Sequence, residues 1–257
     1  MQHAARVVAA GFRFHMKTVL HSAAQVVYLA VVPVVYATLG FFIFEAGGGR
    51  ETLLWIALGA GMMGIWSSTL VGSGMALQRE RWAGTLEILL STPPPFVLVL
   101  TGITLATAAA GLYSLVATLV WGALVFDVPL DVEHPLLFVL SIPATVLVLG
   151  LLGLVLAATF IFYRQTFALT NLLEYPIWLV TGLLVPLALL PAWVEPLAWL
   201  VGPTWGVRAM RESALGGEPL PALLMCVGLG VAYLAAGTLC LRYFETVARR
   251  NATLALT

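Results

Sequence analysis

Few side chains in this sequence could do chemistry, and they are unevenly distributed. The chain has 12 basic and 12 acidic residues in 257, yet the stretch from Gln78 to Pro95 holds Arg79, Glu80, Arg81 and Glu87 within ten residues. Closely spaced charges of both signs suit electrostatic recognition of a partner better than catalysis. We therefore predict that residues 78–95 form a docking surface for another protein chain.

The residue patterns of several other functions are missing from the sequence. It has no GxxxxGK[ST] phosphate-binding loop, so we do not expect this chain to hydrolyse ATP. The histidines do not combine with carboxylates at metal-ligand spacing, and two cysteines, Cys226 and Cys240, offer neither a metal site nor a disulfide framework. A formal net charge of zero leaves no basic patch for nucleic acid. We predict no catalytic residue, no metal and no nucleic-acid partner.

Glu174 is the one acidic residue that falls appreciably inside an apolar stretch. A charge within the membrane is costly, so it is the first place to look for a functional site. One interpretation is that Glu174 lines a substrate path or pairs with Arg164. The alternative is that its side chain extends back to the cytoplasmic interface. The scarcity of other such groups argues against an ion-driven carrier.

The composition predicts an all-α integral membrane protein. Hydrophobic residues make up 61% of the chain, charged residues 9%, and the mean hydropathy is +1.02, whereas about a quarter of residues are charged in soluble domains. A spanning helix needs about 20 mostly apolar residues. Six segments qualify: Ala23 to Phe44, Thr52 to Leu77, Phe96 to Phe126, Leu136 to Phe162, Thr170 to Leu190 and Leu220 to Phe244.

The basic residues predict the orientation of these spans. Lys and Arg near the ends of spans stay in the cytoplasm. With the N-terminus inside, only Arg50, Arg208 and Arg211 of the 12 basic residues fall on the outer side. We therefore predict a multi-pass protein of the plasma membrane with both termini in the cytoplasm.

Two segments outside the spans have their own character. In residues 1–21 the apolar side chains share one helical arc and the cations a neighbouring one, which predicts an amphipathic helix in the membrane interface. Residues 191–218 contain Trp193, Trp199 and Trp205, and Trp favours the headgroup level. We expect one or two short helices there that dip into the outer leaflet and return, with Thr204 as a helix cap.

The charged segment itself has helical spacing. If Glu80 to Leu90 is one helix, its apolar side chains share an arc, its charges lie on another, and Pro93 to Pro95 end it. The alternative is an ordinary interfacial turn. The apolar arc consists of Trp82, Leu86, Leu89 and Leu90.

The run from Arg79 to Pro93 closely resembles the E-x-x-x-G-T-L-E-x-L-L-x-(S/T)-P segment of type-2 ABC exporter permeases. The stretch from Gly206 to Glu212 is similar to the family's outer stretch before the last span. In that family the first segment includes a coupling helix that rests in a cleft of the ATPase. The resemblance implies this coupling role for Arg79, Glu80, Arg81, Trp82, Gly84, Thr85, Glu87 and Leu90.

The resemblance also implies what the whole chain does. Residues 1–257 would form one transmembrane domain without its own cofactor, working with two cytosolic ATPase subunits that bind ATP and Mg²⁺, and with a second permease copy or a paralogue. The complex would move a small amphipathic substrate, such as a drug, an antibiotic or a lipid, outward through the membrane lipid. Glu174, Trp193, Trp199 and Trp205 would be gate or pathway residues.

Three other functions stay open at this point. The first is a permease for a lipid-linked polysaccharide. The second is a membrane-embedded enzyme that modifies lipids, which would need clustered acidic, His or Arg residues at the membrane surface. The third is a purely structural membrane subunit.

Overall fold

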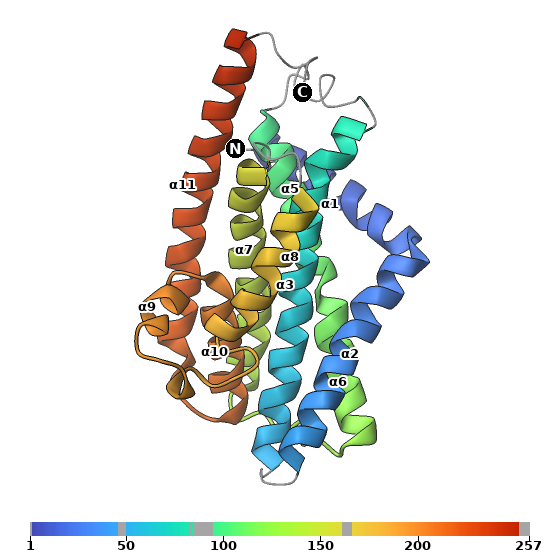
Figure 1. Ribbon diagram of the computed structural model, residues 1–257, viewed down its shortest axis with the longest axis vertical. Helices are drawn as coiled ribbons and strands as arrows, with labels where there is room; N and C mark the ends of the chain where they lie inside the picture. Colours follow the sequence, from blue (N-terminus) through green and yellow to red (C-terminus); the bar gives the residue numbers. More distant parts are fainter. Residues whose placement is uncertain (1, 46–49, 83, 85–94, 161–165, 252–257) are drawn as a thin grey trace.

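The computed structural model describes residues 2–45, 50–82, 84, 95–160 and 166–251, and in these residues it contains helices and no strands (Figure 1). The α-helices form an elongated bundle. They are α1 (Gln2–His21), α2 (Ala23–Glu45), α3 (Arg50–Trp82), α5 (Phe96–Ala110), α6 (Leu112–Val125), α7 (Pro135–Phe160), α8 (Thr166–Val180), α9 (Val194–Trp199), α10 (Gly202–Leu215) and α11 (Pro219–Asn251), with a 3₁₀ turn, η1, at Leu187–Leu189.

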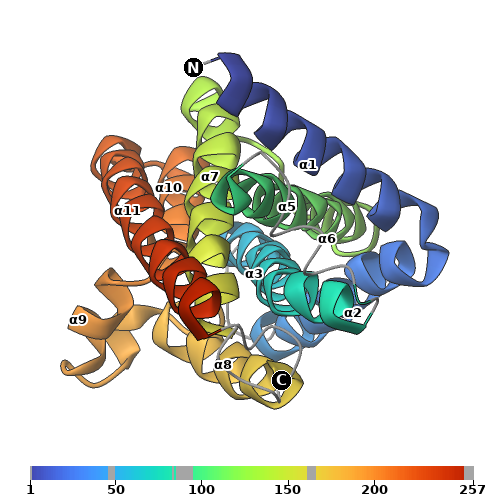
Figure 2. The ribbon, with the colours of Figure 1, turned by 90° about the horizontal axis from the view of Figure 1, so that it is seen from above.

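Helix α3 is the centre of the bundle. It contacts α2, α5, α6, α7, α8 and α10, which surround it in the view from above (Figure 2). In the most apolar 18-residue stretch of α3, 83% of the stretch is buried, against 17% in the corresponding stretch of α11. Its small residues explain this position, because glycine lets helices approach closely in lipid. A Cβ added to Gly61 would lie 2.8 Å from the Leu115 Cα of α6, so this approach leaves no room for a side chain.

A proline in α2 is matched by a hydroxyl from α6. Pro33 has no N–H, so the carbonyl of Leu29, four residues earlier, loses its usual helical donor. Ser114 Oγ donates a hydrogen bond of 2.5 Å to that carbonyl, which is buried away from water. This is the way membrane helices tolerate proline, since a neighbouring side chain satisfies the freed backbone group.

Helix α1 lies across α5 at one end of the bundle (Figure 2). Gly11 and Gly102 meet at the crossing: a Cβ on Gly102 would lie 3.2 Å from the Gly11 Cα. Val19 is fully buried beside α2 and α5, whereas Arg6, Arg13 and Lys17 are exposed. The position of α1 in the membrane interface stays a prediction.

Five helical segments in the described residues are long and apolar enough to cross a membrane: 23–42, 52–76, 96–125, 135–160 and 219–244. The predicted span from Thr170 to Leu190 is different, because its helix, α8, begins at Thr166 and ends at Val180. Fifteen residues of α-helix extend about 22 Å, less than the roughly 30 Å hydrocarbon core. The expectation of a helix through Leu190 was wrong, and the six-span count stays a prediction.

The segment between α8 and α11 contains the short helices expected there. Helix α10 lies beside α7 and α11, and α9 contacts α8 and α10, in the half of the bundle away from α1 (Figure 1). The cap assigned to Thr204 was wrong, because α10 already begins at Gly202 and makes no side-chain cap bond. Thr204 Oγ1 instead donates to the Ala198 carbonyl of α9 at 2.7 Å, so it ties the two short helices together.

Candidate functional site

Glu174 lies in the interior of the bundle. It is the ninth residue of α8 and its side chain is only 7% exposed. Ser67, in the middle of α3, donates a hydrogen bond of 2.5 Å from its hydroxyl to Glu174 Oε1. The carboxylate therefore points inward to α3 rather than toward the end of its helix, so the interpretation of a side chain extended to the interface does not fit. Its expected partner Arg164 lies outside the described residues.

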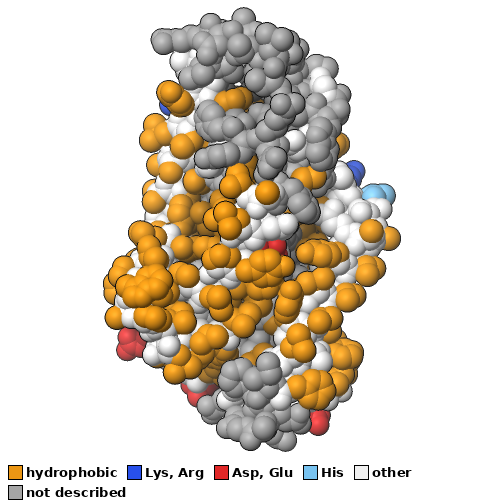
Figure 3. Space-filling model, viewed as in Figure 1, with side chains coloured by type: hydrophobic (Ala, Val, Ile, Leu, Met, Phe, Trp, Pro, Cys, Tyr) orange, Lys and Arg blue, Asp and Glu red, His pale blue; other side chains and the backbone are white. Residues whose placement is uncertain are grey.

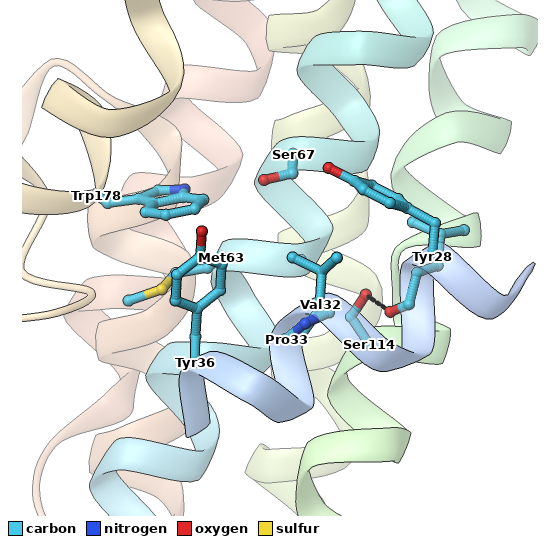
Figure 4. Close-up of a pocket in the computed structure, with 10 residues that line it drawn as sticks. Tyr28, Val32, Pro33, Tyr36, Met63, Ser67, Ser114 and Trp178 are labelled. Atoms are coloured by element: carbon cyan, nitrogen blue, oxygen red, sulfur yellow. Dashed lines mark hydrogen bonds between the residues drawn. The ribbon is translucent and has the colours of Figure 1, made fainter. Parts of the chain in front are cut away.

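A small hollow lies beside Ser67, between α2, α3, α6 and α8 (Figure 4). Its cavity volume is about 10 Å³, room for about one water molecule, and the empty space of about 260 Å³ around it includes the open surroundings. Its lining includes Tyr28 and Tyr36 from α2, Met63 and Ser67 from α3, and Trp178 from α8. The Tyr36 and Trp178 rings meet edge to face, with their centroids 5.0 Å apart. Aromatic rings thus form part of the wall of a hollow that Ser67, the hydrogen-bond partner of Glu174, also lines.

A second buried charge lies toward the other end of the bundle, where Arg211 of α10 reaches α3. Its guanidinium donates hydrogen bonds to the carbonyls of Gly182 and Leu183 at 2.8 and 3.1 Å, and to the Trp55 carbonyl at 3.2 and 3.3 Å. It also lies over the Trp55 ring, 3.4 Å from the centroid. Gly182 and Leu183 directly follow α8, so Arg211 holds the end of that helix against α3 and α10.

Helix α8 ends close to Gly182, and both the backbone conformation of this glycine and its contact with Arg211 agree with an end at this point. Gly182 has φ of +76°, a conformation that favours glycine and ends helices. Arg211 donates to the carbonyls of Gly182 and Leu183, which lie two and three residues beyond Val180, the last residue of α8. We call the set formed by Arg211, Trp55, Gly182 and Leu183 the Arg211 clamp.

The three tryptophans predicted as gate residues separate into two groups. Trp193 is 69% exposed and Trp199 is also exposed, whereas Trp205 is 8% exposed and belongs to the main core. Trp205 Nε1 donates to the Trp199 carbonyl at 2.8 Å, and Arg208 lies over the Trp205 ring at 5.6 Å. Trp205 therefore has a packing role here, while the other two face outward.

The charged segment is described only at its start. Helix α3 includes Arg79 to Trp82, and Gly84 follows with φ of +66°. The interpretation of Glu80 to Leu90 as one uninterrupted helix does not hold, because Gly84 has a left-handed backbone. The coupling helix implied by the family resemblance falls mostly outside the described residues and stays a prediction. The other predicted coupling residues, Thr85, Glu87 and Leu90, lie outside the described residues.

The architecture defines a multi-pass helical membrane protein with two separate buried charges. A family model described as ABC-2 type transporter matches residues 6–215. This match covers most of the chain, so the chain belongs to the ABC-2 type transporter family, as the sequence motif predicted. It is a membrane permease domain, and such permeases normally work with a cytosolic ATPase subunit. A comparison with curated proteins found no match.

Several residues of these two sites were missed from the sequence. Arg211 was noted as a basic residue on the outer side and as part of the stretch from Gly206 to Glu212, without a role of its own. Ser67, Tyr36 and Trp178 were not singled out. One available signal was the spacing of Glu174 and Trp178, which are four residues apart and therefore share one face of a helix. Nothing in the sequence indicates that this face meets Ser67.

Proposed function

We propose that this chain is the permease subunit of an ATP-driven exporter that moves a hydrophobic or amphipathic compound outward, powered by a separate ATPase. The observation that carries the proposal is the match to the ABC-2 type transporter family over residues 6–215. The absence of a phosphate-binding loop from the sequence agrees with an ATPase on another chain. The assembled complex would contain two ATPase subunits and a second permease.

The charge distribution supports an orientation. Arg6, Arg13 and Lys17 on α1 and Arg242 near the end of α11 are exposed at one end of the bundle (Figure 1). Acidic side chains of the visible face gather mostly toward the other end, and hydrophobic side chains cover the region between (Figure 3). Because basic residues stay inside, the end that carries α1 would face the cytoplasm. The charged segment after α3 would then meet a cytosolic ATPase.

The apolar composition of the predicted spans favours a small amphipathic substrate over a lipid-linked polysaccharide. Only Glu174 lies appreciably inside an apolar stretch of the sequence. A sugar chain would need many hydrogen-bonding partners, since unpaired polar groups are costly in an apolar site. The lipid-modifying enzyme would need clustered acidic, His or Arg residues at the membrane surface, a pattern that the sequence does not contain.

The proposal is tested by transport into inside-out membrane vesicles that contain the chain together with a candidate ATPase subunit. We expect a fluorescent lipophilic probe to accumulate only with hydrolysable ATP and only when both proteins are present. The probe set should contain neutral, anionic and cationic members, so that substrate preference does not decide the outcome. ATP-independent accumulation, or equal accumulation without this chain, would contradict an exporter function.

Charge reversal at the start of the charged segment tests its docking role. Replacing Glu80 or Glu87 with lysine should reduce co-purification of the ATPase and substrate-stimulated ATP turnover by about tenfold, the scale on which a lost interfacial charge pair acts. The matched control is Glu195→Lys on α9, which is exposed toward the other end of the bundle and should leave both readouts unchanged. If the Glu80 and Glu87 variants bind the ATPase normally, residues 78–95 are not its docking site.

A further inference from the structure

We propose that the outward face of α1 binds the headgroups of anionic phospholipids at the edge of the membrane. Arg6, Arg13 and Lys17 form this surface, which we call the cationic face, and all three are exposed. Binding of lipid here needs neither ATP nor a partner chain. The inference therefore goes beyond the proposed function and does not depend on it.

The first support is the arrangement of charge on α1. At about 100° per residue, Arg6, Arg13 and Lys17 lie within an arc of about 40°. They extend over about 16 Å of the helix axis, and α1 contains no acidic residue. Basic side chains without interspersed carboxylates are attracted to a negatively charged lipid surface. The cationic face therefore complements a layer of phosphate groups.

The second support is that the opposite face of α1 packs against the rest of the bundle. A Cβ on Gly11 would lie 3.0 Å from the Val99 carbonyl oxygen of α5. Val19 is fully buried in a cluster with Leu29 of α2 and Ala110 of α5. Helix α1 thus lies along the edge of the bundle in the view from above, with its cationic face turned away from α5 (Figure 2).

The third support is the level at which α1 crosses α5. The apolar stretch that begins with α5, residues 96–125, has 30 residues, or about 45 Å of helix. The hydrocarbon core is only about 30 Å thick, so about 7 Å at each end of this stretch reaches the headgroups. The crossing residues Val99 and Gly102 lie about 5 and 9 Å beyond Phe96. Helix α1 is therefore level with the boundary between headgroups and acyl chains, where interfacial helices lie.

Two exposed apolar side chains adjoin the cations. Phe14 is 71% exposed and Leu20 is 46% exposed. Each is three residues from Lys17, so both are its neighbours on the helix surface. A phospholipid satisfies the whole surface, because its phosphate pairs with the cations while its acyl chains cover the apolar side chains. A soluble polyanion would leave Phe14 in water.

A cytosolic ATPase fits the cationic face less well than lipid does. Helix α11 extends beyond α1 at this end of the bundle (Figure 1). A protein that docks on this end would meet such protruding elements before it reached a helix at the level of the headgroups. We therefore assign the cationic face to lipid.

The test uses two photoactivatable lipids that carry the same acyl-chain diazirine, one a phosphatidylglycerol and the other a phosphatidylcholine. The purified full chain would be irradiated in phosphatidylcholine nanodiscs that contain a trace of either probe, and labelled peptides would be quantified by mass spectrometry. Exposed Leu224 and Val227 of α11 report contact with bulk lipid. We expect the ratio of phosphatidylglycerol to phosphatidylcholine labelling to be at least about fivefold higher on α1 than on α11, the factor for one basic side chain near an anionic surface.

Replacing Arg6, Arg13 and Lys17 together with glutamine should lower the ratio on α1 to that on α11. The matched control replaces Arg6 and Arg13 with lysine, which keeps the charge and should keep the excess. Equal ratios on α1 and α11 of the native chain would overturn the inference, and this comparison needs no variant to fold. An excess that survives in the triple glutamine variant would also overturn it.

A protein contact at the cationic face is tested in the same nanodiscs. Addition of the candidate ATPase subunit should leave the excess labelling of α1 by phosphatidylglycerol unchanged. If the ATPase instead abolishes labelling of α1 by both probes, the cationic face is a protein contact and the inference is wrong.

Discussion

Replacing Arg211 with methionine is expected to destabilise the protein severely. The substitution keeps an apolar stem of similar length but removes the guanidinium that donates to the carbonyls of Gly182, Leu183 and Trp55. A buried carbonyl that loses its donor costs about 1–3 kcal/mol, so loss of the donor to the two that follow α8 should cost about 2–6 kcal/mol. The measurement is the thermal unfolding midpoint of the purified chain in detergent, followed by size-exclusion chromatography.

Arg208 provides the matched control three residues earlier on the same helix. Its side chain is 52% exposed and it pairs with Glu212 at 2.7 Å, one turn away. Exposed pairs of this kind contribute about 0.3–0.5 kcal/mol, so Arg208→Met should leave the unfolding midpoint nearly unchanged. Arg211→Lys should recover little stability, because an ammonium lacks the planar fork that reaches several carbonyls at once. Equal unfolding midpoints for Arg211→Met and Arg208→Met would show that the clamp has no structural role.

Gly61→Leu is the second substitution with a large expected effect. A Cβ at this position would lie 2.7 and 2.8 Å from Leu115 Cδ1 and Cα, and 2.9 Å from Thr118 Oγ1. Because one of these atoms belongs to the backbone of α6, the helices themselves must separate. Overpacking a core costs about 1–3 kcal/mol and sometimes more. We expect a lower yield of folded protein in the membrane and a lower unfolding midpoint.

Gly228→Leu on α11 is the control for this change. It adds the same side chain to a glycine in a spanning helix, but no atom lies within 4 Å of a Cβ built on Gly228. Leucine is also the better helix former, by up to about 1 kcal/mol. The control should therefore fold as well as the native chain or better. If the two variants behave alike, close packing at the α3–α6 crossing is not what limits stability.

The glycines of the second predicted span show that the sequence can indicate where helices pack closely. The crowding of Gly59, Gly61, Gly64, Gly72 and Gly74 in this span favours close helix packing. At the first four of these positions a Cβ would meet a neighbouring side chain or carbonyl. The similar set in the last span, Gly228, Ala232 and Ala236, is exposed in the chain. The same spacing thus has two outcomes, because spacing fixes which residues share a face and not what that face meets.

The helix interruptions at Gly182 and Gly84 show that hydropathy and apolar spacing do not locate the end of a helix. Hydropathy continues smoothly through Leu190, so a helix was expected to that point, and the apolar spacing through Leu90 left a helix as one of two interpretations. Gly182 and Gly84 have positive φ and interrupt them. A glycine in the middle of an apolar run is compatible with a helix and with its end. At Gly182 the choice agrees with the contact to Arg211, which lies 29 residues away.

The sequence by itself determined that this is a helical membrane protein of the ABC-2 type, where most of its spans lie, and that Glu174 is an exceptional acidic residue. These properties depend on local composition, on the length of apolar runs and on a short motif. Only the tertiary structure decided that Glu174 meets Ser67, 107 residues away, and that Arg211 meets Trp55, 156 residues away. The physical reason is that helix packing brings together faces whose partners are set by the whole bundle, and a buried charge is defined by such partners.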